Sequence, residues 1–300
     1  MENKKAITVL VIIIAILSLI ASSVGVFSGQ GGILEQEQFL SLSGENITLH
    51  GRGIYQNDSV SAAAQVIAQD IVTLALGIPM LLISLFLARK GSLKGRLLLT
   101  GTIGYFLYSY MSYAFLCMYS SLFLVYVVLM STSLFAFIMC VMTFDIAALK
   151  NAFSTKLPVR FIGGFQLFIA FMLFMMWLGR IVPPLIAGNI PLGLEHYSTL
   201  VIQAMDLGII VPVATLSGIM LIKKKNLGYL LSSIIIIKGL TMLTALTAMI
   251  IGMINAGVKV SIVEMTVFPM FNLIAVFCLV VLLRNINENK YISNESNYSA

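Results

Sequence analysis

Residues Thr199 to Met253 read TLVIQAMDLGIIVPVATLSGIMLI, then KKKN, then LGYLLSSIIIIKGLTMLTALTAMIIGM. Each of the two long apolar runs, wound as a helix at ~1.5 Å per residue, is long enough to cross a hydrocarbon core of ~30 Å. Lysines concentrate in loops that stay on the cytoplasmic side, so the KKKN turn is expected there. The stretch therefore predicts a pair of antiparallel membrane-spanning helices.

The composition of the whole chain agrees with this prediction. Of its 300 residues, 59% are hydrophobic and 10% are charged, whereas soluble domains carry about 25% charged residues. The apolar runs are continuous and do not alternate with polar residues, which argues against a transmembrane β-barrel. The net charge of +6 comes mainly from basic residues in loops between the runs. We therefore expect the lipid bilayer as a partner and no nucleic acid.

Six further apolar runs complete an all-α, polytopic bundle of about eight spans. They cover residues Ala6–Phe27, Val66–Ala88, Leu97–Cys117, Leu122–Phe144, Phe161–Leu178 and Ile262–Leu283. Residues 1–283 are predicted to form one transmembrane domain with an extracytoplasmic loop at 28–65. The start of that span at Val66 is preceded by SAAAQ, which favours helix and extends the span outward. Residues 284–300 are rich in Asn and Ser, which predicts a disordered cytoplasmic tail.

The basic residues in the loops set the predicted orientation. Of the 18 Lys and Arg residues, 14 fall in segments that are cytoplasmic when both termini are inside. We therefore expect a multi-pass protein of the cell membrane with both termini in the cytoplasm. Lys4, Lys5 and the run Ala6–Phe27 also resemble a signal peptide, although the run is longer than the usual 7–15 residues. If that segment were cleaved, seven spans would remain.

Several ionisable and polar residues lie within the predicted spans, where a charge is costly and usually faces the bundle interior. Together they form a hypothetical ligand or ion site, mostly in the outer half of the bundle: Asp70, Arg180, Asp206, Lys238, Glu264, Gln69, Gln203 and Asn272. Lys238 is the clearest signal because it follows four isoleucines near mid-membrane. It is interpreted either as a binding-site cation or as the partner of Asp206 in a buried ion pair that orients two helices.

A faint internal repeat relates the second and sixth spans. Val66–Asp70 resembles Val201–Asp206, and each acid is followed by a glycine and by a proline, Pro79 or Pro212. Both spans run in the same direction, so a duplication would be a parallel repeat. The prolines predict kinks. The aromatic residues Tyr113, Tyr119 and Trp177 are assigned to the outer aromatic belt.

Motifs for catalysis are missing from the sequence. There is no Walker A motif, no HExxH, no GxSxG and no cysteine pair with zinc spacing. We predict no catalytic residues, metal or cofactor. The leading hypothesis is a transporter of a small molecule or an ion. The alternatives are a sensor or assembly factor that binds a partner through loop 28–65, and a membrane-embedded enzyme. The oligomeric state stays open.

Parts of the sequence resemble a known group of proteins. Residues 51–60 read GRGIYQNDSV, residues 68–74 read AQDIVTL, and residues 88–110 read ARKGSLKGRLLLTGTIGYFLYSY. These stretches, with LGRIVP at 178–183 and the helix of Asp206, resemble a group of prokaryotic multi-pass membrane proteins. The resemblance covers most of the chain. It implies the same topology and brings no activity, since none is assigned to that group.

Overall fold

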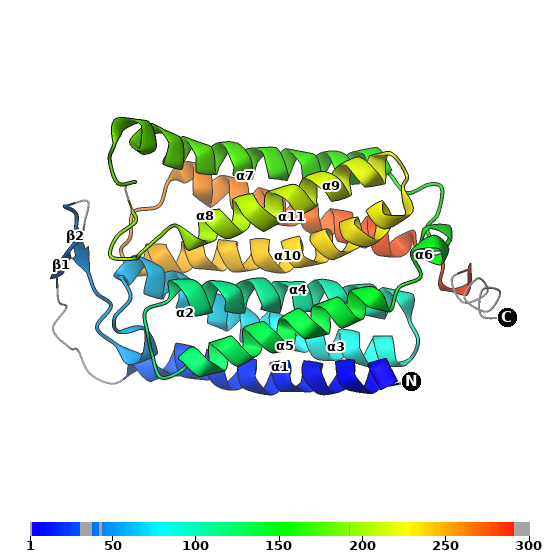
Figure 1. Cartoon of the computed structure of the whole chain (residues 1–300), viewed down its shortest axis with the longest axis horizontal. Coiled ribbons are helices and arrows are strands. Elements are labelled where there is room, and N and C mark those ends of the chain that lie inside the picture. The colour runs from blue at the N-terminus through cyan, green and yellow to red at the C-terminus, as the bar shows by residue number, and fades with distance from the viewer. Residues whose placement is uncertain (1, 31–37, 42–43, 192, 291–300) are drawn as a thin grey trace.

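A computed structural model, which describes residues 2–30, 38–41, 44–191 and 193–290, shows a bundle of long helices (Figure 1). Seven helical segments of the described chain are long and apolar enough to cross a membrane. They are α1 (Glu2–Phe27), the run α2–η3–α3 (Val60–Val72, Thr73–Gly77, Ile78–Arg89), α5 (Phe123–Met142), α7 (Val159–Ala187), the run α8–η4–α9 (Val201–Met205, Asp206–Ile210, Val211–Ile222), α10 (Asn226–Asn255) and α11 (Ile262–Arg284). The prediction of a multi-pass, all-helical membrane protein is therefore confirmed.

The third predicted span forms α4 (Leu93–Leu116), which is not among those seven segments because it is rich in hydroxyl and aromatic side chains. It lies in the middle of the bundle and packs against α3, α5 and α10 (Figure 1). A Cβ atom on Gly101 would lie 2.4 Å from the Cβ of Ile237, so this glycine allows α4 and α10 to approach closely. The helix begins where the Ser92 hydroxyl accepts a hydrogen bond from the Gly95 amide at 3.1 Å.

The two ends of the bundle carry different small elements. One end holds the start of α1, the end of α11 and the short helix α6 (Ile146–Ala152), and we call it the terminus end (Figure 1). The opposite end, the hairpin end, holds the antiparallel strands β1 (Gln38–Leu40) and β2 (Asn46–Thr48). It also holds the short turns η1 (Ser28–Gln30) and η2 (Gly53–Tyr55). The predicted outward extension of the second span is confirmed, since α2 begins at Val60.

The segment after α11 differs from the predicted disordered tail. Residues 285–290 cross the terminus end and pair with the chain that follows α6. The Ser154 amide donates to Asn285 O, and the Asn287 amide donates to Ala152 O, both at 2.8 Å. Between these bonds Ile286, which is buried, forms a β-bridge with Phe153. A single apolar residue among asparagines is enough to fix this segment, while residues 291–300 lie outside the described chain.

The structure repeats one unit at a spacing of 133 residues. In both halves a π-helical segment, η3 or η4, is followed by a proline, then by a helix, a tight turn and a second long helix. Pro79 and Pro212 occupy equivalent places. Because a proline ring crowds the preceding turn, a wider turn accommodates it. In each wide turn an amide reaches the carbonyl five residues back, from Ile78 to Thr73 and from Val211 to Asp206.

Equivalent glycines close the helical hairpin in each half. A Cβ atom on Gly95 would lie 2.5 Å from the Cβ of Leu87, and one on Gly228 would lie 2.4 Å from the amide nitrogen of Leu221. These glycines are also 133 residues apart. Any side chain at either position would push apart the helices on both sides of the turn, so the two halves share the same packing solution.

The structural register corrects the repeat suggested by the sequence. Letter similarity places Asp70 opposite Asp206, whereas the π-helical segments, prolines and glycines place Asp70 opposite Gln203 and Thr73 opposite Asp206. The letters mislead because apolar helices resemble one another in many registers. The backbone features tolerate only one register.

Candidate functional site

The first candidate site, the Asp206 site, consists of Tyr108, Trp177, Asp206 and Lys238. Asp206 begins the π-helical segment η4 and is 8% exposed. Its carboxylate accepts hydrogen bonds from the Tyr108 hydroxyl at 2.7 Å and from the Trp177 Nε1 at 2.9 Å. The donors come from α4 and α7, so the site joins helices from both halves of the bundle.

Lys238 faces the same tyrosine from α10. Its Nζ lies 3.8 Å from the centre of the Tyr108 ring, in a cation–π contact, and the residue is 8% exposed. Within the described chain its ammonium group has no hydrogen bond and no carboxylate oxygen within ion-pair distance. Tyr108 therefore connects Asp206 to Lys238, with the ring contacting the cation and the hydroxyl contacting the carboxylate. The predicted coupling of the two charges takes this indirect form.

The second candidate site, the Asp70 site, lies in the first half, near the hairpin end. Asp70 is 1% exposed. Its carboxylate accepts hydrogen bonds from the Tyr55 hydroxyl at 2.7 Å and from the Tyr113 hydroxyl at 3.2 Å. The Tyr126 hydroxyl lies 3.4 Å from that of Tyr55. A Cβ atom on Gly25 would lie 1.8 Å from the Asp70 carboxylate, so α1 must have glycine there. In the described chain no basic group pairs with this acid.

The repeat relates polar positions of the two halves. Thr73 and Tyr105 share a hydrogen bond of 2.8 Å in the first half. Their equivalents, 133 residues later, are Asp206 and Lys238. The equivalent of Asp70 is Gln203, which is buried and forms no hydrogen bond with any described residue. The same scaffold therefore holds a neutral pair in one half and two charges in the other.

The remaining predicted site residues lie elsewhere. Gln69 is buried and donates to the Ser109 hydroxyl at 2.6 Å, beside the Asp70 site. Asn272 exchanges hydrogen bonds with Thr244, which joins α11 to α10. Arg180 donates to Gly193 O at 2.9 Å in the loop after α7.

Glu264 belongs to neither site. It is exposed, and its carboxylate accepts hydrogen bonds from the Ser261 amide at 3.1 Å and hydroxyl at 3.0 Å. The Ser261 hydroxyl accepts in turn from the Glu264 amide, which completes a capping box at the start of α11. Its placement in the ligand site is therefore not supported by the geometry.

Sequence reasoning missed the aromatic partners of the acids. Tyr113 and Trp177 were assigned to the outer aromatic belt, but they bind Asp70 and Asp206. Tyr119, at 79% exposure, does have the exposure expected of a belt residue. Tyr113 lies on the polar and aromatic stripe of α4 that includes Tyr105 and Tyr108, and following this stripe one turn further would have included it.

The loops at the hairpin end form a fixed cap around Asp58. Its Oδ1 accepts hydrogen bonds from the Met118 amide and the Tyr197 hydroxyl, both at 3.0 Å. His196 contacts Asn57 O at 2.9 Å. Burial raises the pKa of the Asp58 carboxyl above its ordinary value, against the lowering effect of the two hydrogen bonds. Its Oδ2 is buried without a partner among the described residues, which agrees with that direction.

These features define the class of the protein: a multi-pass membrane protein with two buried acidic sites under a folded cap. Among the described residues no group of three or more His, Cys, Asp and Glu side chains is placed to hold a metal ion. No protein-family model, curated protein or solved structure matches the chain. The resemblance to prokaryotic multi-pass proteins therefore stays a prediction.

Proposed function

We propose that this protein transports a small molecule or an ion across the cell membrane, using the Asp206 and Asp70 sites in the outer half of the bundle. Lys238 is buried without an anionic partner in the described chain, and this observation carries the proposal. An isolated charge inside a membrane is costly, and such residues usually mark substrate, ion or proton pathways. Asp70, buried among phenol groups, supports the same interpretation.

The proposed topology is eight spans with both termini in the cytoplasm. Two observations support it. The 24 residues of α4 give a length of about 36 Å, enough to cross the hydrocarbon core although the helix is partly polar. The start of α1 and the end of α11 lie at the same end of the bundle (Figure 1), as an even number of crossings requires. In this topology the hairpin end faces outward.

The two sites have different chemical roles in the proposal. Asp70, with no counterion in the described chain, either holds a proton or takes a cation from the transported species. Lys238 offers hydrogen-bond donors to an anionic group, and Asp206 offers an acceptor once Tyr108 or Trp177 turns away. A ligand with both an anionic and a hydrogen-bond donor group suits the Asp206 site best.

The test begins with a ligand-stabilisation screen of the purified protein, because only bound compounds raise the melting temperature by mass action. Trp177 is the only tryptophan of the chain, so its fluorescence reports on the Asp206 site directly. Compounds that shift both signals are then tested for uptake into proteoliposomes with an imposed pH gradient. Asp206→Asn and Lys238→Met are expected to abolish uptake and leave the protein folded.

Glu264→Gln is the matched control, since it neutralises an acid that the structure places outside both sites. It should transport as the wild type does. The transport proposal is wrong if Asp206→Asn and Lys238→Met both fold and keep every ligand response and every uptake rate.

A second candidate function, a sensor or assembly factor, is favoured by the folded cap at the hairpin end. Loop 28–65 was expected to bind a partner, and part of it is held against the loop after α7 through Asp58, Tyr197 and His196. Phe39 on β1 is exposed. If Phe39→Ser causes the loss-of-function phenotype while Asp206→Asn does not, the sensor is the better description.

A further inference from the structure

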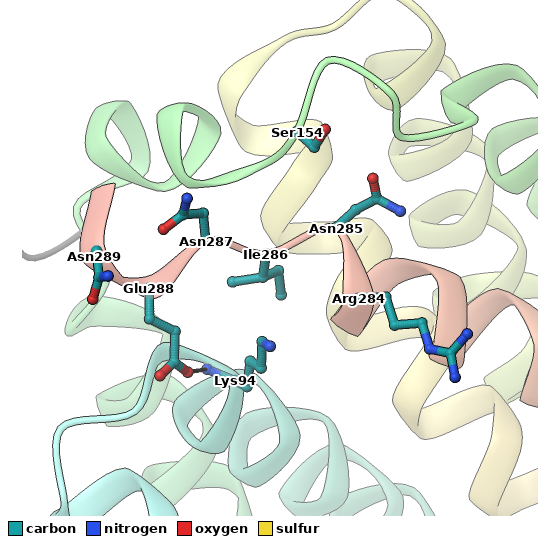
Figure 2. Close-up of a pocket in the computed structure, with 8 residues that line it drawn as sticks. All are labelled: Lys94, Ser154, Arg284, Asn285, Ile286, Asn287, Glu288 and Asn289. Carbon is teal, nitrogen blue, oxygen red and sulfur yellow. Dashed lines mark hydrogen bonds between the residues drawn. The ribbon is translucent and has the colours of Figure 1, made fainter.

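The terminus end holds two cavities that lie beside the segment 285–290. The first, of about 500 Å³, is lined by residues that include Lys94, Arg284 and Glu288 (Figure 2). Glu288 is already engaged, because its Oε1 accepts from the Ser92 hydroxyl at 2.6 Å and from the Lys94 amide at 3.1 Å. This carboxylate occupies the N-terminus of α4 and anchors the segment. The first cavity thus contains its own anion.

The second cavity has no such anion. Its volume is about 420 Å³, which is within the usual range of ligand pockets. Its polar lining comes from three separate parts of the chain: Lys150, Asn151, Ser154 and Thr155 from α6 and the following loop, Lys224 and Tyr229 around the start of α10, and Asn287 and Lys290 from the last described segment. Three lysines and no acidic residue line it among the described residues.

The backbone at Lys224 gives an independent indication. Lys224 has φ of +54°, a left-handed conformation in which side chains other than glycine are disfavoured. The equivalent residue in the first half, 133 positions earlier, is Gly91 with φ of +85°. The same turn therefore has a glycine where no lysine is needed and a strained lysine where the cavity lies. Strained residues of this kind cluster at ligand sites.

We propose that this second cavity binds a phosphate group, either from the headgroup of an anionic phospholipid or from a soluble phosphate compound. The lysines repel one another, and a bound phosphate offsets that repulsion while its oxygens accept hydrogen bonds from ammonium, amide and hydroxyl groups. The cavity lies where α7 and α10 begin and α9 ends, the level at which lipid headgroups meet a bundle. The inference does not depend on transport, since the Asp206 site lies elsewhere.

The full-length protein in phosphatidylcholine nanodiscs is the sample for the test. One arm adds phosphatidylglycerol to the nanodiscs, and the other adds pyrophosphate to the buffer, at constant ionic strength. A rise in melting temperature in the first arm identifies a lipid headgroup, and a rise in the second identifies a soluble phosphate. Absence of a rise in both arms overturns the proposal.

Three variants locate the binding. Lys224→Gly should weaken binding about ten-fold and also raise the melting temperature of the ligand-free protein, because glycine relieves the backbone strain. Lys150→Gln should weaken binding similarly without that rise, and it keeps the test valid if Lys224→Gly does not fold. Lys223→Gln removes a neighbouring lysine outside the cavity lining and should change neither property. Equal weakening in all three variants would indicate a general charge effect and overturn the proposal.

Discussion

Tyr108→Phe tests the Asp206 site most directly, because it removes one hydroxyl and keeps the ring that contacts Lys238. The lost bond is the 2.7 Å hydrogen bond to Asp206, whose carboxylate then keeps only Trp177 as a donor. A hydrogen bond to a charged group contributes about 1.5–3 kcal/mol, and one between neutral groups about 0.5–1.5 kcal/mol. We expect a loss of about 1.5–3 kcal/mol in the free energy of unfolding if Asp206 is ionised.

The assay is equilibrium unfolding in a denaturing detergent, followed by the fluorescence of Trp177. Tyr119→Phe is the matched control, because that tyrosine is 79% exposed and has no hydrogen bond among the described residues. The control should stay within about 0.5 kcal/mol of the wild type. If Tyr108→Phe loses no more than the control, the hydrogen bond does not stabilise the site and the account of Asp206 is refuted.

A double-mutant cycle then separates the bridging role of Tyr108 from a direct ion pair. Tyr108→Phe and Asp206→Asn should couple strongly, because each removes one partner of the same bond. Asp206→Asn and Lys238→Met should couple more weakly, since the ring of Tyr108 lies against the ammonium group. The opposite order would favour a direct ion pair between Asp206 and Lys238.

Three further predictions concern topology, packing and pH. A cysteine at Asn46 should react with an impermeant thiol reagent added to intact cells, whereas one at Lys90 should not; labelling at Lys90 would contradict the proposed orientation. Gly101→Ala should lower the unfolding free energy by about 1–3 kcal/mol because α10 fills the space, whereas Gly164→Ala, with open space around it, should not destabilise the protein. Because the folded-state pKa of Asp58 is raised, its ionisation costs stability as pH rises from about 4 through that pKa. The melting temperature of Asp58→Asn should therefore gain on the wild type over that range, and a constant difference would contradict the assignment.

The long helices were predictable because membrane insertion depends on a local property, the length of an apolar run. The predicted end of the second span at Ala88 and the observed end of α3 at Arg89 differ by one residue. The fifth span was predicted to end at Leu178, but α7 continues to Ala187. The prolines at 183 and 184 suggested an end there, yet both fit within the helix. The π-helical segments were not predicted, although each precedes a proline.

The site was only partly predictable because its geometry depends on contacts between distant segments. Asp70 and Asp206 were identified correctly as buried acids, but their phenol and indole partners come from other helices or from the loop of Tyr55. Glu264 shows the opposite case. Ser261 followed three residues later by Glu264 is the local pattern of a capping box, and it accounts for that acid without any ligand.

The repeat provides an internal control for the charges at Asp206 and Lys238. A pair required for folding would be expected in both halves, yet the first half keeps the same scaffold with neutral Thr73 and Tyr105. Replacing buried charges with neutral groups of similar size is often neutral or stabilising, whereas removing one of two coupled charges is not. The double variant Asp206→Asn with Lys238→Met should therefore be more stable than the sum of the single losses predicts, measured by detergent unfolding, while it lacks transport. A double variant that fails to fold when both single variants do fold would show that the second half needs its charges for structure.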